Sequence, residues 1–171
     1  MKNPRVALIQ ATPAIFNLEA GVDKTLQWIE KAGKEQADVI LFPESFIPGY
    51  PRGMNSGAAV GRRTPGGRQL YRWYSENSME IHGRPLERIA KHAAKVKAYV
   101  ILSITEKDAV TGTLYCTMVY LGPDGRYLGK HRKLKPTGTE RVIWGEGDGA
   151  GLTTVETPFG IMGGLICWEN Y

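Results

Sequence analysis

Apolar residues in the first quarter of the chain alternate between strand-like runs and helix-like spacing. Residues 6–9 (VALI) form a continuous apolar run, which is typical of a strand covered on both faces. Asn17 can cap a helix, whose apolar residues recur at helical spacing and which we expect to end at or near Gly33. Residues 39–42 (VILF) form a second apolar run that stops at Pro43. Together these elements predict a β-α-β unit in a layered α/β fold.

The remaining pattern predicts a long loop, two more helices and several strands. Residues 43–68 are rich in proline and glycine, which indicates a loop of unusual length. A helix is expected over residues 70–79 with Leu70, Trp73 and Tyr74 on one face, and another from Pro85 onward. A polar loop covers residues 133–150. Strands are expected over residues 100–104 and in two hairpins, which pair 114–121 with 127–130 and 152–156 with 161–166.

Length and composition are those of one soluble globular domain of 171 residues. The net charge of +5 is dispersed along the chain, and no basic stripe or binding motif accompanies it, so we expect no nucleic-acid partner. Cys116 and Cys167 form no cluster of metal ligands, and such sparse cysteine use fits a reducing compartment. The first apolar run is too short for a signal sequence or a membrane span. We therefore expect a cytoplasmic protein that binds no membrane.

Three reactive side chains each follow an apolar strand. Glu44 comes directly after the strand that ends at Pro43, Lys133 follows the strand that begins at residue 127, and Cys167 follows the run GGLI at residues 163–166. Strand ends in a layered α/β sheet converge on one edge, where ligands bind. The pattern therefore predicts that these three side chains meet.

A cysteine, a carboxylate and a lysine make chemical sense as a set. Only the thiolate is a strong nucleophile, and a free thiol is mostly protonated at neutral pH. A carboxylate within hydrogen-bond reach can take the thiol proton. A lysine can stabilise the anion that develops on the attacked group, and its charge also favours the thiolate.

Three segments carry a close resemblance to a known family. They read PESFIPGYPRG at residues 43–53, HRKLKPTGTER at 131–141 and CWEN at 167–170. In this order they resemble the signature segments of the nitrilases, which belong to the carbon–nitrogen hydrolase superfamily. The resemblance runs from the first strand to Cys167, and it implies an α-β-β-α sandwich of which this chain holds the N-terminal half.

The resemblance implies a role for each matching residue. Cys167 is the nucleophile of a Cys-Glu-Lys triad, Glu44 is the general base and later the general acid, and Lys133 stabilises the tetrahedral species. Glu140 matches a second glutamate that helps to position the site. The backbone N–H of Trp168 is expected to face the developing negative charge. No metal or organic cofactor is implied.

The lysine has two candidates, because Lys135 lies in the same basic run as Lys133. In relatives that act on amides this segment reads Arg-Lys-x-His-Leu, and alignment on Arg132 favours Lys133. We expect most of the surrounding basic side chains to be solvated and His131 to be structural.

The sequence leaves the roles of several other residues open or suggests only a structural role for them. The side chain of Trp168 either lines the pocket or fills the core, and Glu169 either supports the site or pairs with a neighbouring arginine. Tyr50 and Arg52 lie on the long loop and are candidates for substrate contact. Cys116 lies inside a predicted strand, where we expect a buried thiol without a role.

The segments KLKPT at 133–137 and WGEGDG at 144–149 favour the nitrilases over the amidases of the same superfamily. The implied reaction is hydrolysis of a small organic nitrile to the carboxylic acid and ammonia, through a thioimidate and then a thioester on Cys167. An amidase, or an inactive piece that contributes surface to an oligomer, is the alternative.

Nitrilases continue well beyond the nucleophile, whereas this sequence stops four residues after Cys167. We therefore expect one carbon–nitrogen hydrolase domain over residues 1–171, truncated after the nucleophile. The resemblance also implies a homo-oligomer for the full-length protein.

Overall fold

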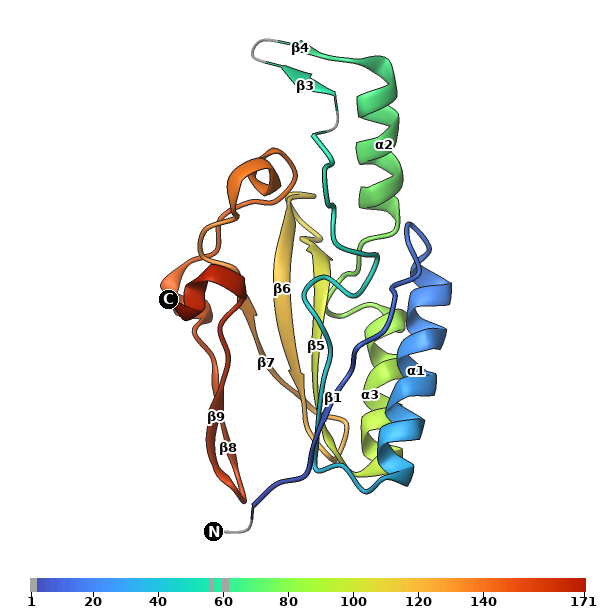
Figure 1. The fold of residues 1–171 in the computed structure, drawn as a ribbon, viewed down its shortest axis with the longest axis vertical. Coiled ribbons are helices and arrows are strands. Elements are labelled where there is room, and N and C mark those ends of the chain that lie inside the picture. The colour runs from blue at the N-terminus through green and yellow to red at the C-terminus, as the bar shows by residue number, and fades with distance from the viewer. Residues whose placement is uncertain (1–2, 56, 60–61) are drawn as a thin grey trace.

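A five-stranded mixed sheet forms the centre of the computed structural model, which describes residues 3–55, 57–59 and 62–171 (Figure 1). Its strands lie in the order β1-β2-β5-β6-β7. β1 and β2 are parallel, as are β2 and β5, whereas β6 is antiparallel to both β5 and β7. The strands span Val6–Leu8 (β1), Val39–Leu41 (β2), Tyr99–Lys107 (β5), Leu114–Leu121 (β6) and Tyr127–Arg132 (β7).

Helices α1 (Leu18–Lys34) and α3 (Arg84–Val96) connect the parallel strands and pack side by side on one face of the sheet (Figure 1). The predicted β-α-β unit is therefore confirmed. The side chain of Asn17 caps α1 by accepting a hydrogen bond from the amide of Ala20, at 3.0 Å. Gly33 lies in the last turn of α1, where a Cβ atom would come within 2.6 Å of Val96 on α3.

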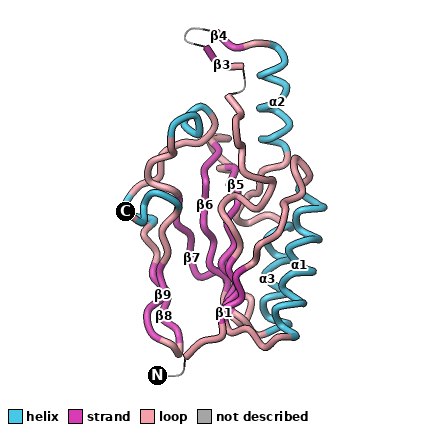
Figure 2. The backbone as a smooth tube through the Cα atoms, in the orientation of Figure 1, coloured by secondary structure: helices cyan, strands magenta, loops and turns pink. Residues whose placement is uncertain are grey.

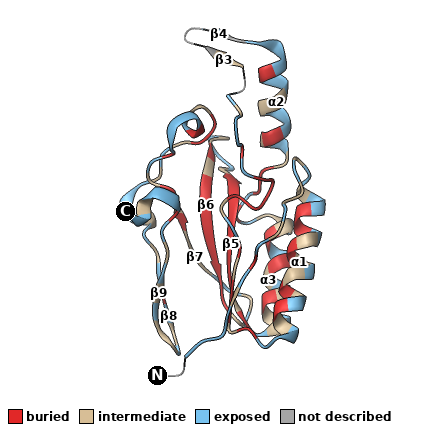
Figure 3. Ribbon diagram, viewed as in Figure 1, coloured by how far each residue is buried: buried red, intermediate tan, exposed pale blue. Residues whose placement is uncertain are grey.

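Apolar side chains of α1 and α3 meet those of the sheet in a buried cluster, and Figure 3 shows β5 and β6 buried along most of their length. Burial of this apolar surface is the main force that holds the helices to the sheet. Members of the cluster include Val22, Ile29, Ile40, Ile89, Leu102 and Val119.

A hairpin of β8 (Thr154–Thr157) and β9 (Gly160–Gly163) lies on the face of the sheet opposite the helices (Figure 1). It confirms the second predicted hairpin, although β9 is shorter than the expected strand. Val155 joins a second buried cluster with residues of β2, β5 and β6, among them Val39, Ile101 and Met118. The fold therefore has three layers: helices, central sheet and hairpin.

β1 is not covered on both faces, contrary to the sequence prediction. Val6 and Leu8 are 49% and 72% exposed. β1 is an edge strand that pairs with β2, and among the described residues the second buried cluster includes none from β1. A continuous apolar run indicates a strand that can be covered, and coverage depends on the layer placed above it.

The segment predicted as a long loop contains two short strands and the start of a helix. β3 (Ala58–Ala59) pairs with β4 (Arg62–Arg63), and α2 (Pro65–Glu76) begins earlier than expected because Thr64 caps it. Residues 56, 60 and 61 of this segment lie outside the described residues. Tyr74 is buried as predicted, whereas Trp73 is exposed because α2 extends beyond the end of the sheet (Figure 1).

Candidate active site

The segments that follow β2 and β7 lie at the same edge of the central sheet. β2 is parallel to β5, and β7 is antiparallel to β6, which is itself antiparallel to β5. β2 and β7 therefore run in the same direction. Each strand is followed by a loop at its carboxyl end, and loops are drawn in pink in Figure 2. This topology brings Glu44 and Lys133 together, although 89 positions separate them in the sequence.

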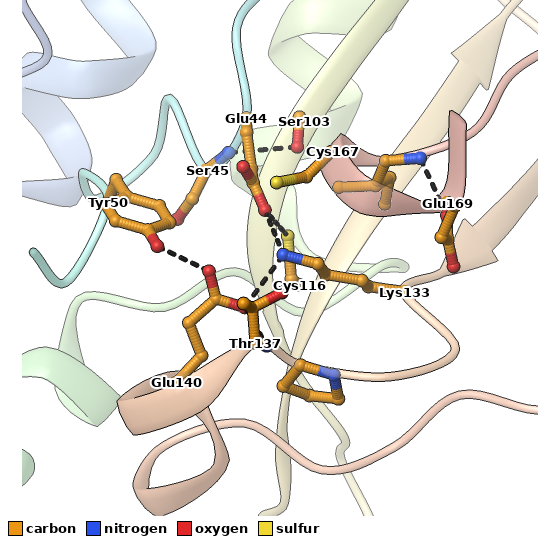
Figure 4. Close-up of polar contacts among 12 residues, drawn as sticks. Glu44, Ser45, Tyr50, Ser103, Cys116, Lys133, Thr137, Glu140, Cys167 and Glu169 are labelled. Atoms are coloured by element: carbon orange, nitrogen blue, oxygen red, sulfur yellow. Dashed lines mark hydrogen bonds and ion pairs between the residues drawn. The ribbon is translucent and has the colours of Figure 1, made fainter. Parts of the chain in front are cut away.

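Lys133 lies between two carboxylates and is only 1% exposed. Its Nζ donates to Oε1 of Glu44 at 2.8 Å and to Oε2 of Glu140 at 2.7 Å (Figure 4). Burial alone would lower the pKa of Lys133, but the hydrogen bonds to Glu140 and Glu44 outweigh burial and raise that pKa above its usual value. The site therefore holds a fixed ammonium group at neutral pH.

Lys135, the alternative lysine, lies outside this arrangement. Its side chain is 70% exposed and pairs with Glu146 at 2.5 Å. Of the two lysines, only Lys133 is within hydrogen-bond distance of Glu44 in the described structure.

Glu140 is buried on a short 3-10 turn, η1 (Gly138–Val142), and holds three donors. Besides Lys133, it accepts hydrogen bonds from the hydroxyl of Tyr50 and from the amide of Thr137, the latter at 2.6 Å. Burial raises the pKa of Glu140, but the bonds from Lys133, Tyr50 and Thr137 outweigh burial and keep that pKa below its usual value. Glu140 therefore remains a carboxylate that fixes Lys133.

Tyr50 joins the long loop to this site. Its ring packs edge-on against Trp144, with centroids 5.7 Å apart, and its hydroxyl binds Glu140. Burial and the hydrogen bond to Glu140 raise the pKa of Tyr50, so its hydroxyl remains a donor. Arg52, the other candidate on the loop, is exposed.

Cys167 begins another 3-10 turn, η3 (Cys167–Asn170), that follows β9. It is exposed, and Figure 4 shows its sulfur pointing toward Glu44. Its φ of 56° lies in the left-handed region, which costs a residue other than glycine about 1 kcal/mol or more. The conformation places the thiol at the start of a tight turn, on the side that faces Glu44 (Figure 4).

Trp168 does not fill the core, which rules out one of its two sequence interpretations. Its side chain is 67% exposed and packs against Tyr171, with ring centroids 5.2 Å apart.

Cys116 contacts the site, which the sequence analysis did not anticipate. It is buried on β6 as predicted, and its Sγ lies 3.5 Å from Oε1 of Glu44 (Figure 4). Burial and the neighbouring charge of Glu44 raise the pKa of Cys116, so it remains a thiol that can donate to this carboxylate. The predicted hairpin could have indicated that Cys116 lies near the site. The β6–β7 register places the carbonyl of Cys116 opposite the amide of Lys133, and these two atoms are 2.8 Å apart.

Most basic side chains around Lys133 are not solvated, contrary to the sequence prediction. Lys130 and Arg132 both bind the buried carboxylate of Glu106 on β5, and the Arg132 guanidinium also lies 3.8 Å from the centre of the Tyr115 ring. His131 is fully buried. Side chains alternate along β7, so Lys130 and Arg132 share one face while His131 points to the other.

In the part of the chain that the structure describes, no group of three or more His, Cys, Asp or Glu side chains is arranged to hold a metal ion. The same residues include no helix long and apolar enough to cross a membrane.

Known proteins resemble this chain over nearly its whole length. An aliphatic nitrilase from Sinorhizobium fredii is 47% identical over 167 residues, which are 98% of this chain and 53% of that protein. A bifunctional nitrilase/nitrile hydratase from Lupinus angustifolius is 43% identical over 166 residues, 97% of this chain and 47% of its own length. The chain thus spans about half the length of these curated relatives.

Structural comparison agrees with the sequence comparison. The crystal structure of Nit3 from Saccharomyces cerevisiae, a member of branch 10 of the nitrilase superfamily, matches with a TM-score of 0.71 at 25% identity. The match covers 96% of this chain and 55% of Nit3. The family profile of the carbon–nitrogen hydrolases matches residues 5–171. With this profile spanning the segments that hold Glu44, Lys133, Glu140 and Cys167, the chain belongs to the carbon–nitrogen hydrolase family.

Proposed function

We propose that this chain carries the catalytic residues of a nitrilase, which hydrolyses a small organic nitrile to the carboxylic acid and ammonia. The observation that supports the proposal most is the buried ammonium group of Lys133 between Glu44 and Glu140, with the Cys167 thiol pointing toward Glu44. The names of the relatives from Sinorhizobium and Lupinus favour a nitrile over an amide as the substrate. Homo-oligomeric assembly and a cytoplasmic location stay predictions from the sequence.

The first half of the reaction uses Glu44 as a base. Its contacts with Lys133 and Cys116 both use Oε1, which leaves Oε2 for the proton of the Cys167 thiol. The thiolate adds to the nitrile carbon, and the nitrile nitrogen takes up the proton, which gives a thioimidate. Lys133 stabilises the negative charge that develops on this nitrogen, because its position is fixed before the reaction begins.

The second half releases the two products. Glu44 activates a water molecule, which adds to the thioimidate and gives a tetrahedral intermediate. Departure of ammonia leaves a thioester, and a second water molecule hydrolyses it to the acid and restores the thiol. If the intermediate expels the thiolate in place of ammonia, the product is the amide, which fits the second activity in the name of the Lupinus relative.

Matched substrates test the proposal against an amidase. The full-length protein should release ammonia from small aliphatic nitriles and arylacetonitriles at least about tenfold faster than from the corresponding amides. The acid should be the main product, with the amide as a minor one. Faster turnover of the amides would identify an amidase, and turnover of neither class would contradict catalysis by this site.

Glu44→Gln should lower kcat by about 10³-fold, since it removes the proton acceptor at nearly constant volume. The amide oxygen of the substituted side chain can still accept from Lys133, so the melting temperature should change little. The measurement is kcat for the best nitrile, followed by ammonia release. Glu146→Gln is the matched control, because Glu146 is an exposed carboxylate near the site. A Glu44→Gln variant within about tenfold of the wild type would exclude Glu44 as the base.

A further inference from the structure

The turn that carries Cys167 needs support from outside the hairpin that precedes it. Pairing between β8 and β9 ends at Gly163, four positions before Cys167, so the ladder hydrogen bonds do not reach the nucleophile. The left-handed backbone of Cys167 is also unfavourable for a residue with a side chain. Such a conformation persists only where neighbouring groups hold it in place.

The carboxylate of Glu169 supplies such a hold. Its Oε2 accepts a hydrogen bond at 2.6 Å from the amide of Ile166, the residue directly before Cys167. Its Oε1 accepts one at 2.6 Å from the amide of Leu134, the residue directly after Lys133. One side chain therefore joins the turn of the nucleophile to the segment of the lysine, through backbone groups adjacent to each.

His131 fixes this carboxylate from inside the fold. Its ring is fully buried, with Nε2 at 2.7 Å from Oε2 of Glu169 and Nδ1 at 3.1 Å from the carbonyl oxygen of Gly151. A carboxylate and a carbonyl oxygen are both acceptors, so each ring nitrogen of His131 faces a group to which an N–H can donate. The contact with Glu169 links β7 to the turn of Cys167.

The protonation of Glu169 agrees with this geometry. Burial raises the pKa of Glu169, but the hydrogen bonds from Leu134, His131 and Ile166 outweigh burial, and the pKa lies below its usual value. Glu169 is thus ionised at neutral pH and accepts from three donors at once.

We infer that Glu169, held by His131, is a positioning residue that sets the Cys167 thiol and the Lys133 ammonium group relative to each other. The inference rests on the proposed function, because the position of Cys167 matters for turnover only if Cys167 is the nucleophile. His131 and Glu169 do not touch the substrate in this role. They act through the backbone on either side of the reacting groups.

Glu169→Gln tests the inference at constant size. An amide offers one acceptor atom where the carboxylate offers two, so its NH₂ group would face one of the three donors. In the full-length protein, kcat for a nitrile should fall by about 10²-fold, while KM should change by less than about threefold. Alkylation of Cys167 by iodoacetamide, followed by mass spectrometry, should also slow, with buried Cys116 as the internal reference. Glu156→Gln, which removes an exposed carboxylate on β8, should leave both quantities unchanged.

Two substitutions of His131 separate positioning from general stability. Asparagine places its NH₂ group near the position of Nδ1, so it keeps the bond to Gly151 and loses the one to Glu169. Glutamine reaches the position of Nε2, so it keeps the bond to Glu169 and loses the one to Gly151. We expect His131→Asn to lower kcat about as much as Glu169→Gln, and His131→Gln to retain most of the wild-type kcat at a similar melting temperature.

These variants decide the inference even if Glu169→Gln does not fold. Equal kcat values for His131→Asn and His131→Gln would overturn it, as would wild-type kcat in both Glu169→Gln and His131→Asn. Failure of the proposed function has a different signature, which is nitrile turnover that persists in Cys167→Ala.

Discussion

Cys167→Ala is expected to abolish nitrile hydrolysis, with kcat lower by at least about 10⁵-fold. Without the thiol no thioimidate can form. Water would then have to attack the nitrile carbon directly, in place of the two easier steps of thiolate addition and hydrolysis of the covalent intermediate. The rest of the site should stay intact, because the side chain of Cys167 is exposed and alanine adds no volume. The measurement is ammonia release under single-turnover and steady-state conditions.

Cys116 provides a matched control for this result. It lies beside Glu44 but is buried, and its raised pKa keeps it a thiol, so it cannot take over as the nucleophile. Cys116→Ala should lower kcat by only about tenfold, through the lost contact with Glu44. Acid quenching during turnover should leave an acyl group on the peptide that contains Cys167 in the wild type and in Cys116→Ala. Turnover that persists in Cys167→Ala, or an acyl group found on Cys116, would contradict the covalent mechanism.

Local sequence signals predicted the elements that present the site. The apolar runs before Glu44 and Lys133, the capping side chain of Asn17 and the two hairpins all correspond to observed structure. Each of these signals acts over a few residues, through backbone preferences and the alternation of apolar positions. Signals of this kind are readable in a single chain, and they placed Glu44 and Lys133 at strand ends.

Features that depend on distant parts of the chain were missed or wrong. The exposure of Val6 and Leu8 depends on which layer covers β1, and that of Trp73 depends on how far α2 extends beyond the sheet. The contact between Cys116 and Glu44 depends on the packing of β6 against the loop after β2. The local spacing of apolar residues carries no information about these exposures or about this contact.

The basic residues around Lys133 show most clearly which features a single sequence leaves undetermined. A cluster of lysine and arginine residues usually indicates a solvated surface. Here the acidic partner Glu106 comes from another strand and draws Lys130 and Arg132 onto one face of β7. A strand predicted to continue two residues beyond Lys130 would have placed Lys130 and Arg132 on one face by side-chain alternation. It would have placed His131 and Lys133 on the other face, toward the site.

Lys133→Met should lower kcat for a nitrile by about 10⁴-fold, equivalent to about 5.5 kcal/mol of transition-state stabilisation. The change removes the ammonium group that the structure places on Glu44, and it also leaves Glu44 and Glu140 close together without the cation between them. The transition state then loses the positive charge that stabilises it, and the two carboxylates repel each other. The melting temperature should fall too, because the buried carboxylate of Glu140 loses its ion pair.

Lys135→Met separates these effects from a general loss of positive charge near the site. Lys135 carries the same charge two positions away, but its side chain is exposed and pairs only with Glu146 in the described structure. Exposed pairs of this kind contribute little to stability, so kcat and the melting temperature should both stay near the wild-type values. A large loss of kcat in Lys135→Met with little change in Lys133→Met would reverse the assignment of the lysine. Equal losses in the two variants would mean that the net charge of the segment matters more than the position of its Nζ, which would leave the bonds from Lys133 to Glu44 and Glu140 without a catalytic purpose.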